Sequence, residues 1–261
     1  MAGLMTVSAL DTTTSTTEAA ATSSQMTGST SPTSVSFDLN TTRLRELNQY
    51  LHHEAASAGV LNVTVRNPNG AHSIAAGMNA AITVEVLGHA GYYAAGMNQL
   101  ADVTITGSVG TGVAENMMSG RVHVKGFASN AAGATAQGGL LIIDGDAGLR
   151  CGISLKGGDI VVGGSVGSFS AFMAQAGNLV VLGNAGEALG DSIYEALLFV
   201  RGKVESLGAD CIEKPMGDAE RARLTGLLRE AGHRDIDPAS FRMYGSARTL
   251  YNFHVDNAGA Y

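Results

Sequence analysis

The chain has 261 residues, with 16 Lys and Arg against 23 Asp and Glu, so its formal net charge is −7 and its pI is about 5.4. This acidic balance offers no basic surface to nucleic acid or an anionic membrane, and no apolar run approaches the roughly 20 residues that span a bilayer. The two cysteines, Cys151 and Cys211, form no CxxC motif, which argues against a metal site and a disulfide framework. We therefore expect a cytoplasmic protein.

Residues 1–36 are dominated by Ser and Thr and contain no Lys or Arg. Such a composition cannot bury enough apolar surface to offset the entropy of ordering the chain. The missing basic residues also argue against a secretory or mitochondrial targeting segment. We expect this stretch to be a disordered tail.

Residues 37–60 are predicted to hold a helix that caps the structure that follows. Thr41 or Thr42 can cap its start and Gly59 can end it. Its apolar stripe consists of Leu44, Leu47 and Leu51. His52 and His53 lie on the same helix, but adjacent helical residues point to different faces, so we expect solvated histidines and no metal pair.

Residues 61–212 repeat with a period of nineteen. A glycine follows each apolar run at this spacing: Gly88, Gly107, Gly126, Gly145, Gly164, Gly183 and Gly202. Two apolar columns keep the same period, one running Val65, Val84, Val103, Val122, Leu141, Ile160, Leu179, Leu198 and the other Val86, Ile105, Val124, Ile143, Val162, Val181, Val200. A third column is small throughout: Ala76, Ala95, Ala114, Gly133, Gly152, Ala171, Gly190 and Ala209.

This period predicts one stacked structural unit per repeat. Each unit contains a β-branched run with alternating character and then glycines, so it holds a strand and tight turns and has no room for a crossover helix. The pattern indicates a mainly β fold, a parallel β-helix of about seven to eight coils with short flanking α-helices, in which equivalent residues lie about 4.8 Å apart. Glycine then serves corners that need a positive φ or leave no room for Cβ. A hexapeptide solenoid fits less well, and the glycine loops lack the Lys-Ser/Thr ending of a P-loop.

One column between the two inner ladders points outward and turns from polar to apolar along the chain. It begins with Glu85, Thr104 and His123 and continues as Ile142, Val161, Val180 and Phe199. An apolar ladder on the outside of a solenoid must be covered. Either the C-terminal segment of this chain or another subunit can supply that cover, and we slightly favour the chain itself because a helix follows.

Residues 213–261 are predicted to contain that helix and a docking segment. Asp218 can cap the helix and Gly232 can follow its end, and the buried stripe is Leu224, Leu227 and Leu228. The last segment places aromatic residues between basic ones, a composition suited to docking against a partner or the solenoid wall. The candidate interface residues are therefore Ile142, Val161, Val180, Phe199, Tyr244, Arg248 and Tyr251.

No catalytic, cofactor-binding or metal-binding constellation is evident in the sequence. Asp144, Asp146 and Asp159 are acidic, but their neighbours in adjacent coils form no acidic ladder, so a solvated face is the favoured interpretation. Cys151 shares a corner column with Ala132 and Ser170, which is typical of a small buried filler.

The glycine-cornered coils resemble the GXGXG β-helix domain that closes the large subunit of glutamate synthase and also occurs in the C subunit of formylmethanofuran dehydrogenase. The resemblance covers about residues 63–216. Its flanks, Leu44-Arg45-Glu46-Leu47-Asn48, Leu207-Gly208-Ala209-Asp210-Cys211 and Tyr244-Gly245-Ser246-Ala247-Arg248, are similar to the β-helix subunit of methylamine–glutamate N-methyltransferase, or N-methylglutamate synthase. Ser129 and Glu205 depart from the pattern, because they replace corner glycines.

The resemblance implies a right-handed β-helix subunit that carries no catalytic residue of its own. It implies a hetero-oligomer with a glutamine amidotransferase-like subunit and an FMN-containing, glutamate synthase-like subunit that also holds an iron–sulfur cluster. That complex would convert methylamine and L-glutamate to N-methyl-L-glutamate and ammonia. The open alternatives are the β-helix subunit of a glutamate synthase or formylmethanofuran dehydrogenase-like complex, and a free-standing binding solenoid.

Overall fold

The computed structural model describes residues 33–248. All of these residues lie within one unit of the chain. They form one sheet of eleven strands with two α-helices and a short 3-10 helix. The elements in chain order are β1 Thr33–Asp38, α1 Leu44–His53, β2 Val60–Arg66, β3 Thr83–Leu87, β4 Asp102–Ile105, β5 Arg121–Val124, β6 Leu140–Ile143, β7 Lys156–Val162, β8 Ala176–Val181, β9 Leu197–Val200, β10 Cys211–Lys214, α2 Asp218–Glu230, η1 Pro238–Ser240 and β11 Arg242–Ser246.

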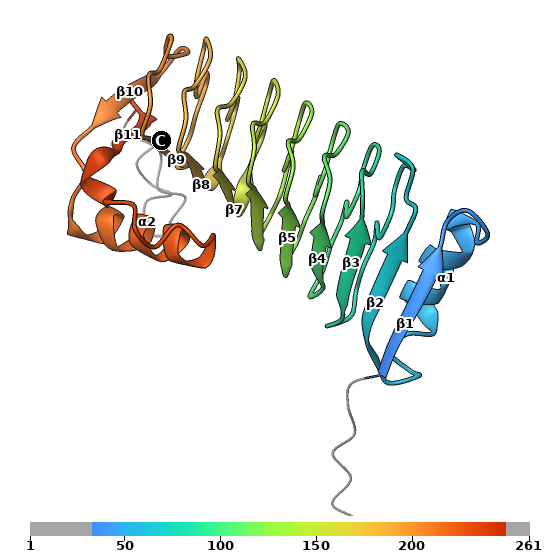
Figure 1. The fold of residues 1–261 in the computed structure, drawn as a ribbon. Coiled ribbons are helices and arrows are strands. Elements are labelled where there is room, and N and C mark those ends of the chain that lie inside the picture. The colour runs from blue at the N-terminus through green and yellow to red at the C-terminus, as the bar shows by residue number, and fades with distance from the viewer. Residues whose placement is uncertain (1–32, 249–261) are drawn as a thin grey trace, which may run out of the picture. The chain divides into compact units, whose positions relative to one another are not determined.

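Strands β1 to β9 lie side by side in sequence order and pair in parallel, one strand for each turn of the chain (Figure 1). This arrangement confirms the parallel β-solenoid. Strand β11 then inserts antiparallel between β9 and β10. Strand β10, which the repeat placed at the end of the coils, therefore belongs to a closing pair of antiparallel strands.

The period of nineteen holds from β3 onward, where Val84 pairs with Val103. The step from β2 to β3 is longer, because Val63 pairs with Val84 and Val65 with Val86. The sequence-based assignment of Val65 to the column of Val84 was therefore wrong. Val63 belongs to that column, and Val65 belongs to the column of Val86. Two additional residues in the first full coil preserve the inward and outward alternation, so the apolar pattern did not reveal them.

Two inward columns of Val, Ile and Leu form the core. Their members are all at most 1% exposed: Val63, Val84, Val103, Val122, Leu141, Ile160, Leu179 and Leu198 in one column, and Val65, Val86, Ile105, Val124, Ile143, Val162, Val181 and Val200 in the other. Burying each such side chain contributes roughly 1.5–3 kcal/mol relative to leaving it in water. The stacked ladders thus supply the main driving force for the fold.

Each coil also turns through alternating residues with a left-handed backbone. In the coil after β3 these are Tyr93, Ala95 and Met97, with φ of 58°, 52° and 55°. The middle position points inward, and from this coil onward it is occupied by the small residues Ala95, Ala114, Gly133, Gly152, Ala171 and Gly190. A left-handed residue with a longer buried side chain would be strained and would clash. This explains the predicted small column from Ala95 to Gly190. The prediction was wrong at its two ends, because Ala75 and not Ala76 is the buried left-handed residue of the first coil, and Ala209 is exposed.

Polar side chains at one corner accept hydrogen bonds from the backbone of the next coil. Asp146 Oδ1 accepts from the Ser165 N–H at 2.7 Å, Ser165 Oγ from the Asn184 N–H at 3.0 Å, and Asn184 Oδ1 from the Lys203 N–H at 2.8 Å. His89 Nδ1 accepts in the same way from the Ser108 N–H at 2.9 Å. These side chains accept hydrogen bonds from backbone N–H groups at the corners, where the coils leave the paired strands.

Helix α1 covers the N-terminal end of the core, and its N-cap is Arg43, so the prediction of a cap at Thr41 or Thr42 was wrong. Its Leu47 and Leu51 are at most 1% exposed, and Asn48 Nδ2 donates to the Ser73 carbonyl at 2.8 Å. His52 differs from the expectation of a solvated residue, because it is partly buried with Nε2 2.7 Å from the Ala76 carbonyl oxygen.

Strand β1 corrects the boundary of the expected tail. Residues 33–36 were assigned to it from their composition, but they belong to β1, which pairs in parallel with β2. Val35 and Phe37 of β1 pack against the main core. Pairing with an existing strand supplies the hydrogen bonds and apolar contacts that this short Ser-rich stretch could not provide alone.

Candidate functional site

The apolar outward column is covered by the chain itself. Its members Ile142, Val161, Val180 and Phe199 are all 0% exposed and form a second core with Leu224, Leu227, Leu228, Phe241 and Met243. Helix α2 and β11 thus supply the cover, at the orange end of the ribbon in Figure 1. These four residues were also candidates for contact with another subunit; that interpretation was wrong, because α2 already excludes solvent and partners from them.

The remaining interface candidates are distributed differently. Tyr244 is 2% exposed within β11, and burial raises the pKa of its phenol. Arg248 forms an ion pair with Asp210, and its side chain is about half exposed. Tyr251 lies outside the described residues. Of the described candidates, only Arg248 presents a substantial surface to a partner.

The corner glycines are required by close approach of the preceding coil. At Gly107, Gly126, Gly145, Gly164, Gly183 and Gly202 a Cβ atom would come within 3.0 Å of atoms of that coil. At Gly107 the nearest atoms are the carbonyl carbon and oxygen of Gly88, both 2.6 Å away. Gly88 itself has φ of 136°. The column has a structural role and presents no side chain to a ligand.

His123 and Asp144 form a polar pair where the cover of α2 ends. His123 is 8% exposed, and its Nε2 lies 2.7 Å from Asp144 Oδ1. Lys125 Nζ is 3.6 Å from the other carboxylate oxygen. In the outward column His123 follows Thr104 of the neighbouring strand β4. The pair could move a proton chemically, but the hydrogen bonds of His123 and Asp144 include no hydroxyl or thiol nucleophile.

Asp159 lies beside α2. Burial raises the pKa of its carboxyl group, although Asn178 Nδ2 donates to Asp159 Oδ1 at 2.6 Å. The favoured interpretation of a solvated face is therefore wrong for Asp159. Asp146 is exposed but its carboxylate belongs to the corner ladder. The three aspartates do not form a shared site.

Both cysteines are buried. Burial raises the pKa of Cys151 to about 12 and that of Cys211 to about 11. A thiol with a raised pKa is a poor nucleophile and metal ligand. The placement of Cys151, at 0% exposure, confirms the buried filler.

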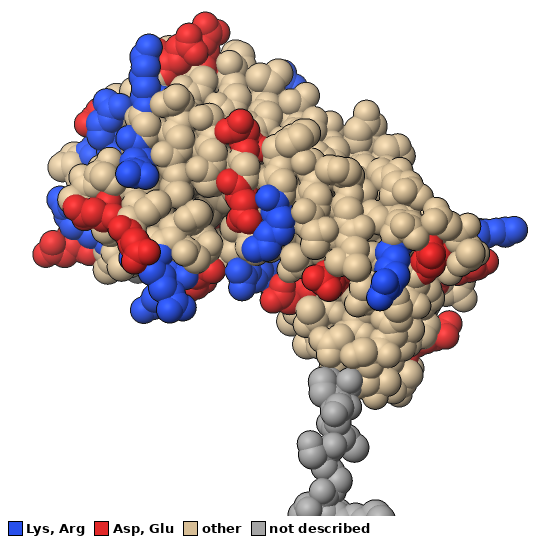
Figure 2. Space-filling view, in the orientation of Figure 1, with Lys and Arg blue, Asp and Glu red and all other residues tan. Residues whose placement is uncertain are grey.

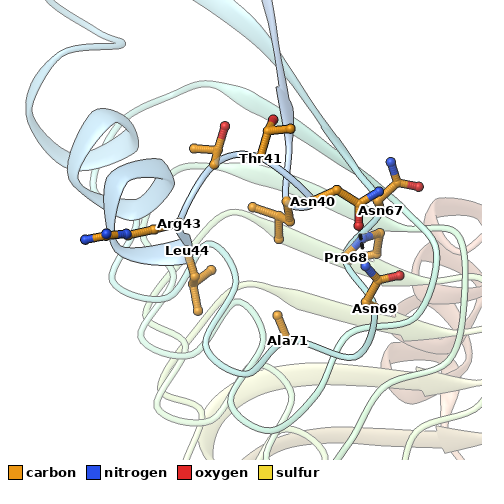
Figure 3. Close-up of a pocket in the computed structure, with 10 residues that line it drawn as sticks. Asn40, Thr41, Arg43, Leu44, Asn67, Pro68, Asn69 and Ala71 are labelled. Carbon is orange, nitrogen blue, oxygen red and sulfur yellow. Dashed lines mark hydrogen bonds between the residues drawn. The ribbon is translucent and has the colours of Figure 1, made fainter.

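A hollow of about 480 Å³ lies beside the segment that precedes α1 (Figure 3). Its lining includes Asn40, Asn67 and Asn69. Asn69 Nδ2 donates to Asn40 Oδ1 at 3.0 Å, and Asn67 Nδ2 donates to Asp38 Oδ1 at 2.9 Å. Because these polar atoms already bind one another across the two segments, we interpret the hollow as part of the N-terminal cap.

An exposed apolar patch follows β3 and has no counterpart in the prediction. Tyr92, Tyr93, Met97 and Leu100 are between 49% and 59% exposed, and Met118 of the next coil is 41% exposed. The coils are joined here, because Gln99 Nε2 donates to Met118 Sδ at 3.0 Å. We call these five residues the Tyr-Met patch.

Exposed aromatic and methionine side chains in one place are typical of protein-binding surfaces. Tyr92 is held in place from the preceding coil, because the His72 ring stacks on it at 4.6 Å and His72 Nδ1 accepts from its backbone N–H. Tyr93 lies beside Glu115, whose carboxyl pKa is raised by burial. The equivalents of Met97 in later coils include Asn116, Thr135, Ser154 and Met173, so this column of the sequence does not by itself single out the coil that carries the patch.

The described residues limit the chemistry of the chain in two respects. Within 33–248, no three His, Cys, Asp or Glu side chains gather in a geometry that could hold a metal ion. In the same part of the chain, neither helix has the length and apolar character needed to cross a membrane. Figure 2 shows charged side chains gathered over the end that carries α2 and β10, with wider uncharged areas over the coils.

Comparison with known proteins relates the chain to one relative over most of its length. It is 57% identical over 224 residues to protein GlxC of Rhizobium meliloti (strain 1021), and this alignment covers 86% of the chain and 98% of that protein. The chain belongs to the GlxC family. No protein-family model matches the sequence. The name GlxC states no substrate or partner, so membership of the GlxC family establishes homology and does not assign a reaction.

Proposed function

We propose that this chain is the non-catalytic β-helix subunit of a glutamate synthase-like enzyme complex. GlxC-family membership and the parallel β-solenoid support this proposal, because both fit the glutamate synthase-like β-helix family indicated by the coils and their flanks. The finer proposal is N-methylglutamate synthase, which converts methylamine and L-glutamate to N-methyl-L-glutamate and ammonia. This chain would hold the amidotransferase-like and FMN-containing subunits in fixed geometry.

The observation that carries the scaffold role is the Tyr-Met patch. It presents large apolar side chains on a coil whose backbone is fixed by neighbouring coils on both sides. In contrast, the corner side chains of His89, Asp146 and Asn184 accept hydrogen bonds from the backbone of the next coil and have structural roles. A rigid wall with an apolar docking surface suits a subunit that positions others.

The cofactors of such a complex would reside on its partner subunits. A cluster of the common type needs four cysteine thiolates, and this chain has two cysteines, both buried with raised pKa values. The residues therefore do not fit an iron–sulfur cluster. FMN on the glutamate synthase-like partner would supply the redox chemistry, and no step of that chemistry is assigned to this chain.

The test is affinity purification of the tagged full chain from its native cells. We expect two co-purifying subunits, a flavin absorbance spectrum, and methylamine-dependent formation of N-methylglutamate by the eluate. A complex that forms glutamate without using methylamine would support the coarser proposal and contradict the finer one. A chain that elutes alone and colourless would contradict both.

A matched pair of variants tests the patch. Met97→Asp with Leu100→Asp places charge on the patch at two left-handed positions that Asp tolerates, so the coil should keep its fold. We expect loss of the co-purifying subunits with an unchanged melting temperature. Leu61→Asp changes an exposed leucine on β2 instead, 51% exposed, and should retain the partners.

A further inference from the structure

A hollow of about 190 Å³ lies on the outward face of strands β2, β3 and β4. Helix α2 covers the outward column from Ile142 of β6 onward, whereas Thr83 and Glu85 of β3 are exposed. A water molecule occupies about 30 Å³ in the liquid. The hollow can therefore hold a small ligand together with a few waters.

The lining of this hollow is polar and follows the register of the sheet. Thr64 of β2 lies opposite Glu85 of β3, and Glu85 lies opposite Thr104 of β4. Thr83 shares the outward face with Glu85, two residues away on the same strand. One carboxylate thus has a hydroxyl group on each neighbouring strand, about 4.8 Å away across the sheet, and another on its own strand.

The polar side chains of this hollow are free, unlike those of the hollow that precedes α1, where asparagine side chains bind across two segments. Within residues 33–248, no hydrogen bond or ion pair engages the polar side-chain atoms of Asn62, Thr64, Thr83, Glu85 and Thr104. Their hydrogen-bonding capacity is therefore available to a ligand.

The charge at the hollow is negative. Among the described residues that line it, only Glu85 is charged, and a second carboxylate, that of Asp102, lies opposite Thr83 in the register of β4. The basic residues of the flanking strands are turned to other partners. Arg66 Nε donates to a hydroxyl of β1 at 3.2 Å, and Arg121 Nη2 donates to a carbonyl at the end of α2 at 3.5 Å. The hollow therefore favours a cation.

A divalent metal ion fits these groups poorly. Ca²⁺ takes about six to eight oxygen ligands, and Mg²⁺ demands near-ideal octahedral geometry. The part of the chain that the structure describes contains no group of three His, Cys, Asp or Glu that could hold such an ion. An ammonium group instead offers three N–H donors, which suit one carboxylate and the hydroxyl oxygens on either side of it.

We propose that this hollow binds a small primary amine in its protonated form, with the Glu85 carboxylate as the opposite charge and the hydroxyls of Thr64 and Thr104 as further acceptors. Aliphatic amines are protonated at neutral pH, since the pKa of the Lys side chain is about 10.4. The site goes beyond the scaffold role, which gives the outward face of β2–β4 no task. It rests on the proposed function only for the choice of methylamine as the probe.

Ligand-observed NMR of the purified full chain tests the site. Methylammonium chloride is titrated at constant ionic strength, and the broadening of its methyl signal reports binding. Glu85→Gln keeps the size of the side chain and should weaken binding at least about tenfold, because the charge-assisted hydrogen bond is lost. Glu195→Gln removes the same charge at an exposed position of another coil and should bind as the parent does.

Two further measurements separate recognition of N–H donors from simple attraction of charge. Thr104→Val replaces a hydroxyl by a methyl group of similar shape and should weaken binding several-fold with an unchanged melting temperature. Ammonium chloride should compete with methylammonium, whereas tetramethylammonium chloride, which has the charge but no N–H donor, should not.

Equal competition by tetramethylammonium and ammonium would overturn the proposal, as would equal affinity of Glu85→Gln and the parent or the absence of any broadening. Potassium chloride that competed as strongly as ammonium chloride would assign the hollow to an inorganic cation and also overturn it. The chain is measured by itself, so these outcomes do not depend on whether partner subunits co-purify with it.

Discussion

His123 Nε2 lies 2.7 Å from Asp144 Oδ1 at the border between the outward residues that α2 covers and those it leaves to solvent. In the outward column Thr104 precedes His123 and Ile142 follows it. The imidazole is 8% exposed, so its ring nitrogen depends on the carboxylate for a partner. The pair therefore joins the polar and apolar halves of the outer strand surface.

Removing the carboxylate should destabilise this border. We expect Asp144→Ala to lower the free energy of unfolding by about 1 kcal/mol, because a nearly buried ring nitrogen loses its hydrogen bond. Lys125→Ala removes the more distant and exposed partner of the same carboxylate and should change stability by less than about 0.5 kcal/mol. Urea denaturation of both variants measures the difference; equal effects would contradict the assigned role of His123.

Two glycine substitutions should act in opposite directions. Gly107→Ala places Cβ 2.6 Å from the backbone of Gly88, so adjacent coils must separate, and we expect a loss of about 1–3 kcal/mol. Gly226→Ala lies in α2 with nothing within 4 Å of the new atom, and should gain up to about 1 kcal/mol from helix propensity. Thermal unfolding separates the two, and a Gly107→Ala protein as stable as the parent would refute the close-approach argument.

The cover of the outward column can be tested inside α2. Leu224 is 0% exposed against the column that includes Val161. Leu224→Ala should cost about 2–5 kcal/mol through lost burial and a cavity. Thr225→Ala, one residue along on the exposed side, should stay within about 0.5 kcal/mol of the parent. Thermal unfolding measures both variants, and equal melting temperatures would show that α2 does not pack where the structure places it.

Asp159 should make stability depend on pH. Burial raises the pKa of this carboxyl group in the folded state, so its contribution to stability is present below the ordinary value of 3.8 and is lost as pH rises through the raised folded value. Asp159→Asn keeps an oxygen to accept from Asn178 and removes this loss. The variant should therefore gain stability relative to the parent as pH rises from about 4.

Chemical denaturation between about pH 3 and 8 measures that gain. Glu195→Gln, at an exposed position, controls for the loss of one negative charge. A difference between Asp159→Asn and the parent that did not vary with pH would show that the carboxyl group titrates alike in the folded and unfolded states.

The core could be predicted from sequence because each inward position contributes to it locally. Val84 and Val103 are apolar in their own coils, and the period alone aligns them. The longer step before β3 was missed for the same reason, since extra corner residues leave the alternation of Val63 and Val65 intact. The Ser-rich composition likewise gave no indication of β1, because this strand forms by pairing with β2.

The closing strands and the Tyr-Met patch could not be predicted from the sequence pattern, because both depend on the three-dimensional arrangement of the chain. Strand β11 pairs with β9, about forty residues away in the chain, through an insertion that no local pattern encodes. The exposure of Tyr93 and Met97 follows from the direction of alternating left-handed residues, whereas the sequence alone drew attention to the small residue Ala95 between them. The sequence therefore indicated an interface at the column that α2 covers.

From β3 to β9 every coil is interchangeable in length, because the register advances by the same nineteen residues at each step. Deleting or duplicating one such unit between β3 and β5, outside the strands that α2 covers, would move α2 relative to α1 by about 4.8 Å without altering either end. The number of coils therefore sets the distance between the two ends of the protein. Duplication of one repeat in the gene would increase the separation of partners bound at the two ends by one fixed step.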